Sequence, residues 1–264
     1  MATTPSYTLR CQRHLILASL LALAVAAWAL LLWQAWHTDA MMAMSPTMGM
    51  GAALWLAIWV VMMVAIMFPT AAPMILVFAQ VYAARRQRQQ AFVPTWVFVS
   101  AYMLVWTLMG VLAYGAAVGA QRLAAQSMWV MENAGRFGGI VLIAAGLYQL
   151  SPLKHLCLAK CRSPLAFIMT SWRNGYGGAF RMGLDHGIYC LGCCWLLFVI
   201  FFPLGMMNVA AMAAVTVLIF AEKSLSLGHR ISQLGALALI VYGLVAVFVP
   251  EVLPTMLGQG HMGM

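Results

Sequence analysis

Runs of about 20 apolar residues recur along the whole chain, and they restrict the possible folds more than any other feature. The 264 residues are 65% hydrophobic and 7% charged, whereas a soluble globular domain carries about 25% charged residues. So few charges cannot cover a water-facing surface. An apolar run of about 20 residues is long enough to cross the roughly 30 Å hydrocarbon layer of a lipid bilayer as a helix. The sequence therefore predicts an all-α, polytopic transmembrane helical bundle.

Seven apolar runs are candidates for membrane-spanning helices, and two of them are short. Backbone polar groups in lipid must be satisfied within their own segment, so these runs are expected to be helical. No long polar segment separates them, which predicts a single integral membrane domain over residues 1–264 with six to seven spans. The expected spans are 15–36, 52–79, 92–119, 136–150, 183–204, 207–220 and 234–249, of which the fourth and the sixth are the short ones.

The distribution of Lys and Arg predicts the orientation in the membrane. With the N-terminus in the cytoplasm, twelve of the 14 Lys and Arg residues fall on the inner side, and two, Arg122 and Arg136, fall outside. This strong bias supports that orientation. It also explains the net charge of +9 without nucleic-acid binding, because no aromatic-interleaved basic domain accompanies it. The expected non-spanning segments are a cytoplasmic tail (1–14), a Met-rich outer loop (37–51), a basic cytoplasmic segment (151–182) and an outer tail (251–264).

Potential metal ligands gather in the stretch GLDHGIYCLGCCW. On a helix, His186, Cys190, Cys193 and Cys194 occupy positions i, i+4, i+7 and i+8, so they share one face. A rise of about 1.5 Å per residue separates His186 from Cys194 by about 12 Å, too far for one ion held by bonds of about 2.3 Å. We expect a metal or redox site at the three cysteines, with His186 and Asp185 one turn closer to the cytoplasm. Packing of the thiols as small apolar groups remains the alternative.

Cys157 and Cys161 form a second thiol pair, spaced C-x-x-x-C, in the basic segment. On a helix they would share a face, and the surrounding Lys and Arg residues favour the thiolate form that binds metals. Their cytoplasmic side keeps them reduced. The spacing differs from the usual C-x-x-C zinc arrangement, so an inner metal acceptor and an ordinary interfacial helix are both open.

The outer loop HTDAMMAMSPTMGM is rich in thioethers. A water-facing loop has no packing reason to choose methionine, and soft ligands such as Met and Cys select Cu(I). The loop is therefore a candidate for metal capture, although a Met-rich segment is also suited to an adaptable partner surface. Its candidate ligands are Met41, Met42, Met44, Met48 and Met50.

Within the second expected span, Met63, Met67 and Met74 share one helical face. Such a face is more often packing than a ligand set. Counted from the inner end of each helix, however, Met74 lies at the depth of Cys190 and Met67 near the depth of Cys194, so the two sulfur faces can meet. Pro69 and Pro73 deprive nearby carbonyls of their helical partners. In a membrane, such carbonyls mark either a kink or a functional break.

Glu222 and Lys223 end the sixth expected span at the cytoplasmic boundary. We interpret them as structural anchors that snorkel or pair with Asp185 or the inner arginines. The sequence contains no nucleotide-binding loop, no Ser-His-Asp set and too few carboxylates for an ordinary acid–base dyad. No catalytic residue is predicted.

Four stretches together resemble a bacterial family of predicted metal-binding integral membrane proteins, an uncharacterised conserved domain. They are WVVMMVAIMFPTAAPM, YQLSPLKHLCLAKCRSP, GLDHGIYCLGCCW and GMMNVAAMAAVTVLIFAEK, within residues 59–223. The resemblance implies metal binding without indicating which metal. This chain departs from the family in having Ile66 before Met67, where members often carry two adjacent methionines. The implied motif positions are Met62, Met63, Met67, Pro69, Cys157, Cys161, Cys190, Cys193, Cys194, Met207, Asn208, Glu222 and Lys223.

The residues and the resemblance together favour a bacterial inner-membrane protein that handles a soft transition metal, above all copper(I), by capture, transfer or transport. In this hypothesis the outer methionines capture the ion, the face of Met63, Met67 and Met74 relays it, and the cysteine cluster holds it. A metal chaperone or a membrane subunit is the expected partner. Two alternatives remain open: a copper-dependent membrane oxidase, which the scarcity of His in the spans disfavours, and an accessory subunit with structural Cys and Met.

Overall fold

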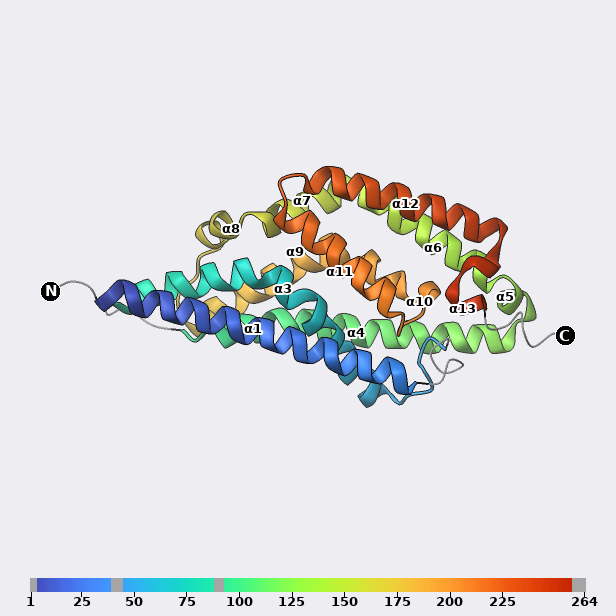
Figure 1. The fold of residues 1–264 in the computed structure, drawn as a ribbon, viewed down its shortest axis with the longest axis horizontal. Helices are drawn as coiled ribbons and strands as arrows, with labels where there is room; N and C mark the ends of the chain where they lie inside the picture. The colour runs from blue at the N-terminus through green and yellow to red at the C-terminus, as the bar shows by residue number, and fades with distance from the viewer. Residues whose placement is uncertain (1–3, 39–44, 88–92, 258–264) are drawn as a thin grey trace.

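The computed structural model describes the chain except residues 1–3, 39–44, 88–92 and 258–264, and its described part is helical, without β-strands. Figure 1 shows α6 and α12 side by side along one edge of the bundle, α1, α3 and α4 along the other, and α9 and α11 between them. The elements are α1 (Thr4–His37), α3 (Ala52–Gln87), α4 (Thr95–Gln126), α5 (Met128–Glu132), α6 (Ala134–Gln149), α7 (Pro152–Arg162), α8 (Pro164–Thr170), α9 (Gly175–Val199), α10 (Phe201–Leu204), α11 (Val209–Ser224), α12 (Gly228–Phe248), a 3-10 turn η1 (Pro250–Val252) and α13 (Pro254–Leu257).

Five of these helices are long and apolar enough to cross a membrane, and α6 with α7, joined at a bend of 61°, makes a sixth if the pair counts as one span. The prediction of an all-α polytopic bundle is confirmed, and the upper count meets the lower end of the expected six to seven. The predicted span 207–220 becomes α11, whose 16 residues extend about 24 Å, less than the roughly 30 Å hydrocarbon layer.

The outer surface of the bundle is apolar in a way that only lipid accommodates. Large side chains face outward along several helices, and Trp36 and Phe248 are each 81% exposed. In water, contiguous surfaces of this kind would drive association. Together with the five long helices, they identify a membrane protein.

Two helices that carry predicted ligands extend well beyond the apolar runs. α3 continues to Gln87 and α9 begins at Gly175, because polar residues at a membrane edge extend a helix into water as readily as they end it. α3 passes through Pro69 and Pro73 without ending. The hydroxyl of Thr70, between them, donates a hydrogen bond of 3.0 Å to the carbonyl of Met67.

α9 lies in the interior because small residues let it approach its neighbours. It packs against α4 and α7. Gly183 is pressed so closely against the Phe98 carbonyl of α4 that a Cβ atom at this position would overlap the oxygen. This close approach brings the cysteine face of α9 within reach of side chains from α4, and α7 covers it from another side.

Candidate metal centre

Three buried thiols from two helices form a close group of potential metal ligands in the described residues. Cys190 and Cys193 lie one turn apart on α9, and Cys161 reaches them from the last turn of α7. Their three sulfur atoms lie within 4.8 Å of one another, and all three residues are buried. We call Cys161, Cys190 and Cys193 the cysteine centre.

The cysteine centre has the dimensions of a three-coordinate metal site. Metal–thiolate bonds are about 2.3 Å long, so three sulfurs around one ion in their plane lie about 4 Å apart. The observed limit of 4.8 Å needs only a small contraction. Thiolates are soft ligands and select Cu(I) or Zn²⁺ rather than hard cations.

Other helices supply groups to the sulfur of Cys190. The Lys223 ammonium of α11 lies 3.1 Å from Cys190 Sγ, and the Tyr102 hydroxyl of α4 lies 3.2 Å from it. Met67 of α3 adds a thioether, with Sδ at 3.9 Å. The ammonium offsets the negative charge that thiolates bring into an apolar interior, and Met67 adds a further soft ligand.

The two remaining cysteines of the predicted clusters lie beside the cysteine centre. Cys194 Sγ is 3.1 Å from Cys193 Sγ but falls outside the group of three. Cys157 is half-buried on the same face of α7 as Cys161, and its sulfur packs against Gly192 so tightly that a Cβ there would overlap it. The expected shared face of Cys157 and Cys161 is present, and it turns toward α9, so the two predicted thiol groups meet in one place.

His186 lies one turn before Cys190 but is not part of the cysteine centre. Its buried ring is surrounded by aromatic rings, with centroids at 5.8 Å for Phe98, 5.3 Å for Tyr102 and 5.6 Å for Phe167. Neither ring nitrogen has a hydrogen-bond partner among the described residues. Asp185 is half-buried.

The expected partners of Glu222 and Lys223 are not the ones that the structure shows. Glu222 forms a buried ion pair of 2.7 Å with Lys154 of α7, not with Asp185 or an inner arginine. Gln149 completes the group, because its amide donates to Glu222 at 2.9 Å and accepts from Lys154. A buried charge requires a nearby opposite charge. In the sequence, Lys154 lies among other basic residues, so this stretch resembles a segment that is exposed to water. The pair joins α7 to α11 next to the cysteine centre.

A family model described as PpoB2, copper chaperone, matches residues 56–246. The chain belongs to this family. The matched range contains the whole cysteine centre together with Met67, Tyr102 and Lys223, and it agrees with the resemblance that the sequence motifs indicated. No curated protein and no solved structure matches the chain. Membership of the PpoB2 copper chaperone family supports a copper-related role for these buried sulfurs.

The methionine face of α3 meets the thiols at a different level from the one expected. Depth counting placed Met74 beside Cys190, whereas Met67 makes this contact. Such counting treats both helices as parallel to the membrane normal, so any tilt between them shifts the register. Met63 and Met74 are buried in the core of this PpoB2 family member, as is Met67.

Residues 39–44 of the expected outer loop lie outside the described residues, and Met41, Met42 and Met44 are among them. Met48 is buried and Met50 half-buried, which contradicts the expectation that these thioethers face water. Asn208, another motif position, caps α11 by accepting a hydrogen bond of 3.0 Å from the Ala211 amide. In this family member, Asn208 therefore has a structural role at the start of α11.

Proposed function

We propose that this protein binds one Cu(I) ion at Cys161, Cys190 and Cys193 and passes it to a partner protein from the bacterial inner membrane. The observation that carries the proposal is the group of three buried thiols within 4.8 Å of one another. Membership of a copper chaperone family supports copper as the cargo, and thiolate ligands are consistent with its monovalent form.

The surroundings of the cysteine centre suit reversible binding. Cu(I) binding displaces protons from the thiols, and Lys223 stabilises the resulting negative charge from 3.1 Å. Met67 Sδ at 3.9 Å from Cys190 and Cys194 Sγ at 3.1 Å from Cys193 provide further sulfurs to which the ion can shift one bond at a time. A chaperone needs such exchange because it must release its cargo.

The distribution of Lys and Arg supports an orientation with the N-terminus in the cytoplasm. In that orientation, Cys161 and Cys157 of α7 lie on the cytoplasmic side of the core, and the segment around Met48 lies at the outer end. We propose that copper enters from the outer end along α3, with Met67 as the last thioether before the cysteine centre. We also propose that residues 1–264 form one membrane domain. A cytoplasmic metal chaperone or a neighbouring membrane subunit would receive the copper.

Copper analysis of the purified full chain tests the binding step. Wild type and a Cys190→Ser/Cys193→Ser variant are purified anaerobically and loaded with Cu(I), with Cys157→Ser as the matched control because its sulfur packs against Gly192. The proposal expects the double variant to bind one equivalent fewer and the control to match wild type. Equal copper in wild type and double variant would contradict it.

Vesicle assays separate delivery from the other activities considered. A chaperone takes up copper in proportion to the protein present and then stops. Accumulation inside sealed vesicles beyond that ratio would indicate a transporter, and copper-dependent oxygen consumption would indicate the oxidase. Either result would replace the delivery step while leaving the cysteine centre intact.

A further inference from the structure

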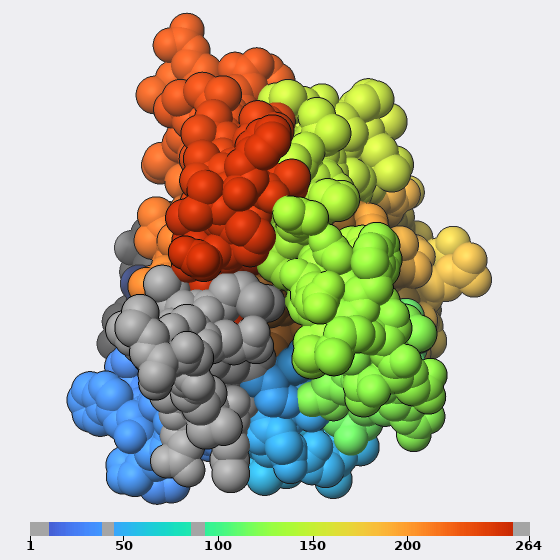
Figure 2. Space-filling view, turned by 90° about the vertical axis from the view of Figure 1, so that its right-hand side faces the viewer, coloured from blue at the N-terminus to red at the C-terminus, as the bar shows by residue number. Residues whose placement is uncertain are grey.

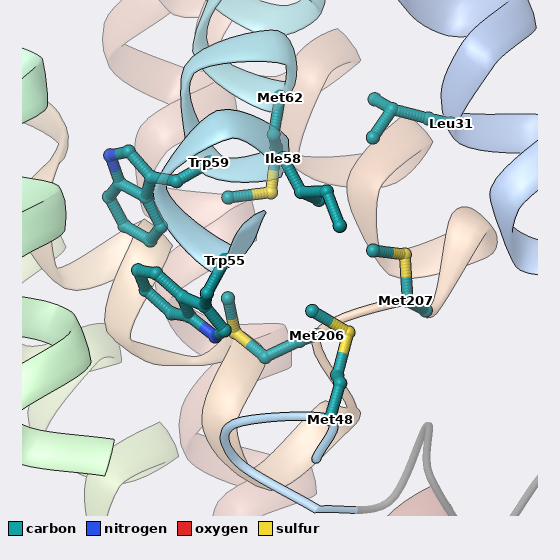
Figure 3. A pocket seen from close by; sticks show the side chains of 8 residues that line it. All are labelled: Leu31, Met48, Trp55, Ile58, Trp59, Met62, Met206 and Met207. Atoms are coloured by element: carbon teal, nitrogen blue, oxygen red, sulfur yellow. The ribbon is translucent and has the colours of Figure 1, made fainter. Parts of the chain in front are cut away.

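Four methionines that are far apart in the sequence surround a small cavity near the end of the bundle seen in Figure 2, where the chain around residue 50 is light blue. Met48 comes from the segment before α3, Met62 from α3, and Met206 and Met207 from the turn between α10 and α11. All four are buried. Figure 3 shows their side chains extending toward one space beside Trp55 and Trp59. We call these four residues and the space between them the methionine cavity.

The cavity has about 10 Å³ of free space, which is close to the smallest volume that admits one water molecule. A water there would need polar partners, and the indole N–H groups of the two tryptophans in the lining already donate to backbone carbonyls. Trp55 donates to the Pro46 carbonyl at 3.3 Å, and Trp59 donates to the Trp106 carbonyl at 2.9 Å. The remaining lining is thioether and aliphatic, so the site is unsuited to water.

Flexible methionine side chains ordinarily fill gaps in a core, so four of them around a space require another explanation. The backbone conformation at Met48 points the same way. Met48 adopts a positive φ of 53°, which is uncommon for a residue with a side chain and costs about 1 kcal/mol or more. Gln121 of α4 holds this turn in place through Ser45 at 2.6 Å and Thr47 at 3.1 Å. The strained turn places the Met48 side chain in the cavity.

We infer that the methionine cavity is a second Cu(I)-binding site, distinct from the cysteine centre. Thioethers are neutral soft ligands, so they favour a monovalent soft cation over Zn²⁺ or hard cations. Trp55 and Trp59, whose rings stack on each other at 5.4 Å between centroids, close one side of the site. Because thioethers carry no proton to displace, the ion binds here without the ionisation that thiol ligands require.

The position of the methionine cavity fits an outer site on the same route. Met62 precedes Met67 by five residues on α3, which is about 7.5 Å along the helix, and Met67 touches the cysteine centre. Trp59 lines the cavity and packs against Phe198 of α9, with 6.2 Å between ring centroids. Phe198 lies one helical turn beyond Cys194. The inference rests on the proposed function only for the identity of the cargo.

Copper binding in a chain without the cysteine centre tests the inference. The full-length Cys190→Ser/Cys193→Ser variant is titrated anaerobically with Cu(I) against a chelator, alone and with Met62→Leu/Met207→Leu added. Leucine conserves the volume of methionine. The matched control adds Met182→Leu/Met212→Leu instead, since these two methionines are fully buried and lie outside the cavity lining.

The expected result is one Cu(I) equivalent in the cysteine variant, bound at least about tenfold more weakly once Met62 and Met207 are replaced, because loss of an outer partner alone costs a site 10–100-fold. The control pair should change nothing. A cysteine variant that binds no Cu(I), or one whose affinity is unchanged by the Met62 and Met207 replacements, would overturn the inference. Failure of the proposed function has a different signature, namely a cysteine variant that binds as much copper as wild type.

Discussion

The cysteine centre and the methionine cavity are both built from buried sulfur, but they differ in their electrostatic surroundings. Lys223 lies 3.1 Å from Cys190 Sγ, and the buried pair of Lys154 and Glu222 lies nearby on the same two helices, α7 and α11, that supply Cys161 and Lys223. The described lining of the methionine cavity contains no charged side chain. A thiol site exchanges protons for metal and needs a counter-charge, whereas a thioether site needs neither. The difference suits the proposed site at the cysteine centre to tight holding of Cu(I) and the proposed site at the methionine cavity to its capture.

The largest effect, on folding stability, is expected from Glu222→Gln, which removes the buried ion pair with Lys154 beside the cysteine centre and leaves the methionine cavity unchanged. Lys154 is 0% exposed, and without its 2.7 Å partner its charge is buried unpaired, which costs about 3–5 kcal/mol. Thermal unfolding in detergent measures the loss. The double variant Lys154→Met/Glu222→Leu should recover most of the stability, because no charge remains buried. A single variant as stable as wild type would show that the pair does not hold α7 to α11.

Cys161→Ser and Cys194→Ser sharpen the boundary of the cysteine centre. Cys161 belongs to the group of three sulfurs and Cys194 does not. We expect Cys161→Ser to weaken Cu(I) binding by about 100-fold or more, beyond the 10–100-fold typical of an outer partner, and Cys194→Ser to weaken it by less than about tenfold. Competition with a Cu(I) chelator gives both affinities. Equal losses would mean that Cys194 is a ligand of the same rank.

Lys223→Met should weaken Cu(I) binding at the cysteine centre by about 10–100-fold, because the thiolate charge loses the ammonium 3.1 Å away. Lys223→Arg keeps the charge and should retain most of the affinity. The methionine cavity should be unaffected by either change. If methionine and arginine variants bind equally well, charge compensation is not the role of this residue.

The smallest effect is expected at the methionine cavity from Gln121→Ala. The variant removes two hydrogen bonds, to Ser45 and Thr47, each contributing about 0.5–1.5 kcal/mol. Looser positioning of Met48 should lower Cu(I) affinity by a few-fold in the Cys190→Ser/Cys193→Ser chain, measured by the same titration. Gln126→Ala, at an exposed position on the same helix, is the control. A loss of Cu(I) affinity of equal size in both variants would show that the Met48 turn has no specific role in copper binding.

Sequence patterns predicted the helices and much of the arrangement of the sulfur atoms, because both depend on local spacing. The shared face of Cys190 and Cys193 follows from the helical repeat, and so does that of Cys157 and Cys161. The meeting of the α3 and α9 sulfur faces was expected from depth, although the contact is made by Met67 and not by Met74.

What the sequence could not predict are the contacts made across helices. The 61° bend between α6 and α7 brings Cys161 to the α9 cysteines, and no local pattern encodes that angle. Lys154 lies in a stretch with other basic residues, which hides its burial against Glu222. Met206, which carries no helical pattern, lies in a turn. A positive φ at Met48 is equally invisible in a Met-rich loop.

Copper X-ray absorption on the Met62→Leu/Met207→Leu chain, loaded with one equivalent of Cu(I), tests the central claim most directly, because the weakened methionine cavity then leaves the ion to the cysteine centre. The account predicts a first shell of three sulfur atoms at about 2.3 Å, lost when Cys161, Cys190 and Cys193 are replaced by serine. A shell dominated by nitrogen or oxygen, or a spectrum that survives the three replacements, would contradict it.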